Sequence, residues 1–175
     1  MAGPALELVL FASSPLVCRH QPEETLNDFL VIVHVLSAAT WIGSGVFSGF
    51  AGSRMAREGA PAALGWARVS KEAGLKVFNP AAFLTALSGI LLVLVSDVYG
   101  WGDAFVTVGL IVVVMAGVIG GVVHRPDADK MITALERADY ETAASLGKRA
   151  AIWGSVTIAL LIVTVSVMVM KTGAG

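Results

Sequence analysis

The sequence predicts an all-α, polytopic membrane protein, an antiparallel bundle of four transmembrane helices with a short N-terminal interfacial helix. Its 175 residues are 56% hydrophobic and only 14% charged, with a mean hydropathy of +0.79. A soluble domain has about 45–50% apolar and about 25% charged residues. Four apolar stretches also reach the roughly 20 residues that a helix needs to cross a bilayer, and ten of the 12 basic residues lie in only two of the connections between them.

Residues 1–26 are predicted to form an extracytoplasmic N-terminal segment. Its start, "MAGPALELVLFASSPLV", is apolar but shorter than a span, and the first basic residue is Arg19. A signal peptide begins with a basic region, so a helix lying on the interface or against the bundle fits better. The single cysteine, Cys18, excludes a disulfide framework within the chain, and its role stays open.

Residues 27–172 form the predicted membrane domain. Pro80 directly follows Asn79 at the start of the second span, which is typical of a helix N-terminus. "SDVYGWGD" reads as a tight turn with aromatic residues at the interface, and Pro126 is expected to stop the third helix. The sequence shows no convincing internal repeat. The four spans cover about 28–52, 79–98, 103–123 and 151–170.

The basic residues predict the orientation. Five lie between the first two spans and five between the last two, whereas the turn between the second and third spans contains Asp97 and Asp103 and no basic residue. The positive-inside rule therefore places both long connections in the cytoplasm and both termini outside, in the cell inner (plasma) membrane. The first connection is expected to turn at Gly59-Ala60-Pro61, and the second to form an amphipathic helix.

Charge and motifs exclude several classes of function. The net charge of −1 and the mixed signs of the connections give no nucleic-acid-binding patch. No Walker loop, paired-carboxylate site or CxxC motif is present, and no catalytic residue is assigned. Asp28, Asp97 and Asp103 sit at the outer ends of the predicted spans, and no Asp or Glu lies deeper inside one. Proton relays and cation carriers usually have a carboxylate there.

The first span has one face of mostly small residues. Positions 34, 38, 41, 45, 48 and 52 follow helical spacing, so His34 and Trp41 are expected to face the neighbouring helices. His34 lies about 9 Å from the outer end of the span at 1.5 Å per residue. An ionisable side chain at such a depth is a functional-site hypothesis by default.

Two interpretations of His34 remain open. In the first, a neutral imidazole bonds a Ser or Thr side chain or a backbone carbonyl of a neighbouring helix; Ser96, Thr107 and Thr164 are expected at similar depth. In the second, His34 ligates a haem or a soft metal ion.

The ligand hypothesis needs a partner at the same depth as His34. His124 lies at the opposite end of the bundle and is better explained as a cation at a helix C-terminus. Met168 and His20 lie near the outer surface with His34. A His/Met or His/His pair suits haem b, and the His/Met pair also suits Cu(I). His34, Trp41 and Met168 are therefore the candidate cofactor-binding residues, and His34, Met168 and His20 the candidate metal ligands.

Three segments, "HVLSAATWIGSGVF", "NPAAFLTALSGILLV" and "VSVMVMKTG", resemble an uncharacterised family of four-helix integral membrane proteins defined only as a domain of unknown function. The first span is also similar to those of the copper-resistance D membrane domain and of the bacterial haem-dependent membrane protoporphyrinogen oxidase. The former resemblance implies copper handling, and the latter implies that His34 is a haem ligand.

The sequence thus leaves three functions open. The favoured one is a non-catalytic accessory protein or subunit of a larger membrane complex, with the lipid bilayer and other membrane subunits, or further copies of itself, as partners. The alternatives are a haem b-binding redox protein that uses His34, and a transporter of copper or another small solute.

Overall fold

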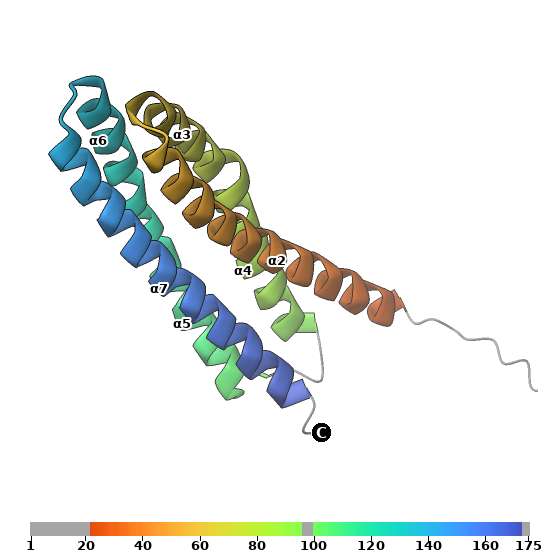
Figure 1. The fold of residues 1–175 in the computed structure, drawn as a ribbon. Helices are drawn as coiled ribbons and strands as arrows, with labels where there is room; N and C mark the ends of the chain where they lie inside the picture. Colours follow the sequence, from red (N-terminus) through yellow and green to blue (C-terminus); the bar gives the residue numbers. More distant parts are fainter. Residues whose placement is uncertain (1–21, 96–99, 173–175) are drawn as a thin grey trace, which may run out of the picture.

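The computed structural model describes residues 22–95 and 100–172, which form an antiparallel bundle of four long helices (Figure 1). The predicted all-α four-helix bundle is therefore confirmed. Each long helix is apolar enough, and long enough, to cross a membrane. Most of the predicted N-terminal segment, with Cys18 and His20, lies outside the described residues.

The four long helices contain the following elements. The first is α2 (Pro22–Arg57). The second combines α3 (Ala60–Ala73), the π-helical turn η1 (Gly74–Phe78) and α4 (Asn79–Val95). The third combines α5 (Ala104–Ile119), the π-helical turn η2 (Gly120–His124) and α6 (Arg125–Glu136). The fourth is α7 (Tyr140–Thr172).

The helices extend well beyond the predicted spans at the end of the bundle that carries the α2–α3 and α6–α7 turns, here called the connection end. The α2–α3 turn is confirmed at Gly59, whose φ of 107° favours glycine. The α6–α7 turn has Ala138 at φ 56°. There the N–H of Asp139 bonds the Ala134 carbonyl and the N–H of Ala138 bonds the Leu135 carbonyl, which is the Schellman arrangement of a helix C-terminus.

The prediction that Pro126 stops the third helix is wrong. The helix widens into the π turn η2, where the N–H of Arg125 bonds the Gly120 carbonyl five residues back. Pro126 then occupies the second position of α6. At that position its ring and its missing N–H are tolerated, so the helix continues for 11 residues after Arg125, up to Glu136.

The second long helix has the same device, which the sequence analysis missed. "GLKVFNP" (74–80) and "GGVVHRP" (120–126) share the pattern Gly-x-x-Val-x-x-Pro. In both segments the π turn begins at the glycine and the proline follows two residues after its end. The corresponding N–H of Asn79 bonds the Gly74 carbonyl. The two middle helices therefore contain a short matched segment.

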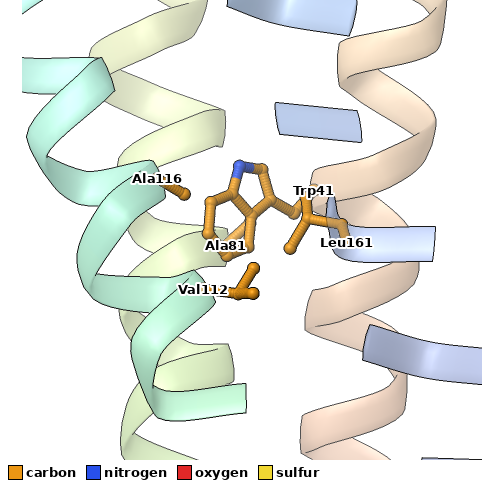
Figure 2. Close-up of a cluster of buried hydrophobic side chains, with 5 residues drawn as sticks. All are labelled: Trp41, Ala81, Val112, Ala116 and Leu161. Atoms are coloured by element: carbon orange, nitrogen blue, oxygen red, sulfur yellow. The ribbon is translucent and has the colours of Figure 1, made fainter. Parts of the chain in front are cut away.

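The core lies where the four long helices meet. Trp41 of α2 is surrounded by one or two buried residues from each of the other helices (Figure 2), namely Ala81, Val112, Ala116 and Leu161. The alanines leave room for the indole ring, since a larger side chain at either position would occupy its space. The prediction that Trp41 faces inward is confirmed.

At the connection end, α3 and α6 pack side by side and are here called the end lobe. Two ion pairs link these helices: Arg68 Nη2 lies 2.8 Å from Glu136 Oε1, and Lys71 Nζ lies 2.5 Å from Asp129 Oδ1. At the opposite end, the first turns of α2 extend away from the rest of the bundle (Figure 1).

Candidate functional site

The most polar buried surface in the spanning part of the bundle lies between α2 and α4. It is formed by His34 and Ser37 of α2 with Thr85 and Ser88 of α4, here called the polar seam. The three hydroxyl residues are buried and His34 is half-buried. Hydroxyl and imidazole groups in such a place need partners, because water is not available to satisfy them.

His34 is held by α4. Its Nδ1 lies 3.0 Å from the Thr85 carbonyl oxygen and 3.2 Å from Ser88 Oγ. A carbonyl oxygen only accepts hydrogen bonds, so in the neutral ring Nδ1 carries the proton and donates it. Ser88 Oγ in turn donates to the Leu84 carbonyl at 2.5 Å. The other ring nitrogen, Nε2, therefore keeps its lone pair.

The remaining hydroxyls complete the seam. Thr85 Oγ1 lies 3.0 Å from Ser37 Oγ and 2.8 Å from the Ala81 carbonyl, and Ser37 Oγ donates to the His34 carbonyl at 3.1 Å. Each polar side chain of the seam thus has a partner within this chain. A satisfied network of this kind joins two helices and fixes their rotation relative to each other.

A glycine determines how closely the imidazole approaches α4. A Cβ atom at Gly89 would lie 3.0 Å from His34 Cε1 and 3.3 Å from His34 Nδ1. Any larger residue would push the ring away from the Thr85 carbonyl. The Ser88-Gly89 pair therefore supplies both a hydrogen-bond partner and the space for the ring.

The first interpretation of His34, a neutral imidazole bonded to a neighbouring helix, describes this geometry. The observed partners, Thr85 and Ser88, differ from the expected ones. Thr164, one of the expected partners, donates to the Leu160 carbonyl of its own helix, and Thr107 is exposed. Ser96 lies outside the described residues. The spacing of three residues between Thr85 and Ser88 puts both on one face of the second span, which is the signal in the sequence that could have indicated them as partners.

The candidate ligands are distributed over different helices. The Met168 methyl carbon lies 3.0 Å from the Cβ position of Gly109 on α5, whereas the hydrogen bonds of His34 go to α4. His20 is outside the described residues, and Trp41 packs in the core with Ala81 and Ala116. Across the described part of the chain, no group of three or more His, Cys, Asp or Glu side chains could hold a metal ion.

A second buried polar group lies at the connection end, and sequence reasoning missed it. Asp127 of α6 is only 4% exposed, and Arg149 Nε of α7 lies 3.0 Å from its Oδ2. The spacing of the buried residues at 112, 116, 119, 123 and 127 would have indicated this position. It was overlooked because Pro126 was expected to end the helix.

The fold and the seam together define an all-α, multi-pass membrane protein whose buried polar groups join its own helices. Comparison with protein-family models, with curated proteins and with solved structures gives no match.

Proposed function

We propose that the protein is a non-catalytic accessory subunit of a larger membrane complex. The observation that carries this proposal is the closed polar seam, in which the hydrogen bonds of His34, Ser37, Thr85 and Ser88 go to one another and to helix carbonyls. A seam of this kind acts as a joint between α2 and α4. It makes His34 a packing residue of the membrane domain.

The outer surface supports an association within the membrane. Large apolar side chains are exposed along the spanning helices, including Phe47 and Phe50 of α2 and Phe83 of α4. Such a surface suits lipid acyl chains, a neighbouring membrane subunit or a second copy of the chain, because all three are equally apolar.

The proposed location is the cell inner membrane with the connection end in the cytoplasm. The ten basic residues of the two long connections lie towards this end of the bundle, which by the positive-inside rule supports an orientation with both termini outside. The end lobe then projects into the cytoplasm. Its α6 helix is about 18 Å long at 1.5 Å per residue, which gives a subunit of this size a contact surface outside the lipid.

Ligation of haem b by His34 is the second candidate, and one observation favours it. Histidines that bind metals usually donate their other ring N–H to a carbonyl or a carboxylate. His34 donates Nδ1–H to the Thr85 carbonyl in this manner, so Nε2 would be the atom that binds the haem iron. This candidate also rests on the resemblance of the first span to the haem-dependent oxidase.

A copper site fits the described residues less well. Cu(I) needs several soft ligands around one ion. Of the three predicted ligands, His34 is held by α4 and Met168 packs against α5, while His20 is outside the described residues. Of the two ligands considered for His34, haem b therefore suits the described residues better than copper.

The test combines two measurements on protein purified in mild detergent from its native membrane. An absorbance spectrum, oxidised and then reduced with dithionite, is recorded beside the composition of the purified particle. A particle with a stoichiometric membrane partner and a featureless spectrum supports the accessory role. The partner should also persist in the His34→Phe variant if the fold is kept.

Two outcomes would contradict the accessory role. The first is a Soret band that shifts on reduction, disappears in His34→Ala and remains in Ser44→Ala; it would favour the haem candidate over the accessory role. Ser44→Ala is the control because, among the described residues, the Ser44 hydroxyl bonds carbonyls of its own helix. A colourless particle that contains this chain as a monomer and no other protein would leave neither proposal standing.

A further inference from the structure

We propose that the end lobe, α3 together with α6, rocks as one unit on the membrane-spanning part of the bundle. The pivot consists of the two π turns, η1 and η2, and the Asp127–Arg149 ion pair is the latch that holds the lobe against α7. This inference is independent of the proposed function.

The two π turns lie at the same height in neighbouring antiparallel helices. Below them, Ala81 of α4 and Ala116 of α5 meet in the core around Trp41. Above them, Lys71 of α3 pairs with Asp129 of α6. Because η1 (74–78) and η2 (120–124) fall between these two levels on their own helices, they lie opposite each other and can act as a single axis.

The sequence weakens both helices at this height. Pro80 and Pro126 have no N–H, so the carbonyls of Lys76 and Val122, four residues earlier, lose their usual helical partner. Each turn also begins at a glycine, which restricts the backbone less than any other residue. Prolines and π turns are the usual places where helices bend.

The lobe above the axis is coupled across its two helices. The Arg68–Glu136 and Lys71–Asp129 ion pairs both join α3 to α6. Each pair is exposed and therefore weak when taken alone. The two pairs act on the same two helices, however, so a bend at η1 carries a bend at η2 with it.

The fourth helix supplies the fixed reference. α7 continues without a π turn from Tyr140 to Thr172, and it contacts the lobe through Arg149. Among the described residues, Asp127 Oδ2 has no well-aligned hydrogen bond, although Arg149 Nε lies 3.0 Å away. Arg149 itself is half-exposed. Apolar packing also joins α6 to α7, as between Met131 and Gly147. In the described part of the chain, the imperfect Asp127–Arg149 ion pair is the polar side-chain contact between these two helices, and it can open.

The test measures distances between spin labels by pulsed electron paramagnetic resonance on the full chain with Cys18→Ser as background. One label pair, at Val69 and Leu94, spans η1 along one helix, about 37 Å at 1.5 Å per residue. The control pair, at Ile152 and Met170, spans about 27 Å of the uninterrupted α7. All four positions are exposed.

Opening the latch with Arg149→Gln is expected to broaden the Val69–Leu94 distance distribution about twofold and to leave the α7 control unchanged, because only the lobe moves. Arg149→Lys, which retains the charge, should restore most of the narrow distribution. The pair Pro80→Ala and Pro126→Ala returns two N–H donors to the helices, and it should cancel the broadening.

Two results would overturn the hinge. One is a Val69–Leu94 distribution of equal width with and without Arg149, in protein whose circular dichroism and melting show an intact fold. The other is equal broadening of both label pairs, which would mean that the whole bundle has loosened. If Arg149→Gln does not fold, Asp127→Asn removes the other charge of the same ion pair. A Val69–Leu94 distribution of unchanged width in that variant contradicts the hinge.

Discussion

At the scale of single residues, the position of His34 depends on the absence of a side chain. Its ring fits against α4 because residue 89 is glycine, and the fit brings Nδ1 to the Thr85 carbonyl. The hydrogen bond of the imidazole therefore depends on the shape of the opposing helix. A substitution that leaves every polar atom of the polar seam in place can still break it.

Gly89→Ala tests this dependence. The new methyl group would lie 3.0 Å from His34 Cε1, so the ring must move, and we expect a loss of about 1–3 kcal/mol in the free energy of unfolding. Gly43→Ala is the matched control, because a Cβ there meets nothing within 4 Å. It should be neutral or stabilising by up to about 1 kcal/mol. Equal effects of the two variants on thermal unfolding in detergent would refute the close fit.

At the scale of elements, the α6–α7 turn is formed with a residue that does not favour its conformation. Ala138 has φ 56° at the position after a Schellman helix end that is usually glycine. The two backbone hydrogen bonds of the motif, together with the start of α7, compensate for this strain.

Ala138→Gly is expected to stabilise the protein by up to about 1 kcal/mol, because it removes the left-handed strain of a residue with a Cβ. The control, Ala144→Gly in an exposed turn of α7, should instead destabilise it by about 0.5–1 kcal/mol. Thermal or denaturant unfolding measures both. A destabilised Ala138→Gly variant would show that strain at this turn is not significant.

Asp139 caps the start of α7. Its Oδ1 accepts a hydrogen bond from the Thr142 N–H at 3.1 Å, and hydrogen bonds from Thr142 lower the pKa of this carboxyl. The stabilisation is therefore fully present above the ordinary carboxyl pKa and is lost as the pH falls through the lowered one. As the pH falls through the lowered pKa of Asp139, hydrogen exchange of the Thr142 amide should become faster relative to exchange of an amide in the middle of α7. Asp139→Asn keeps a cap without a titrating group, so a similar acidic loss in that variant would count against the carboxylate.

At the scale of the whole molecule, one side chain connects all four long helices. Trp41 lies in the core among residues of the three other long helices (Figure 2), namely Ala81, Val112, Ala116 and Leu161. Trp41→Ala would leave a cavity shared by every helix, and we expect a loss of about 3–5 kcal/mol in the free energy of unfolding. Trp153→Ala is the control, since Trp153 is exposed on α7 and should cost far less. A similar cost for both would mean that the core lies elsewhere.

The sequence predicts the fold well because hydropathy and span length depend on the bilayer and need no tertiary information. The inner position of Trp41 also follows from helical spacing alone. The hydrogen-bond partners of His34 and the burial of Asp127 were harder to predict. The first depends on which pair of helices packs together, and the second on a π turn that carries the helix past Pro126. The pairing of helices is a property of tertiary packing and the π turn a property of local backbone geometry, and composition reveals neither.

The long separation in sequence between His34 and its partners also bears on how the protein is made. The atoms that satisfy the imidazole belong to residues 51 and 54 positions further along the chain. A ribosome therefore delivers α2 with a polar ring that has no partner until most of α4 has followed. An unpaired polar group is costly in lipid, so α2 should remain beside the insertion machinery until α4 emerges. On this basis, α2 does not enter the bilayer before α4 can pack beside it.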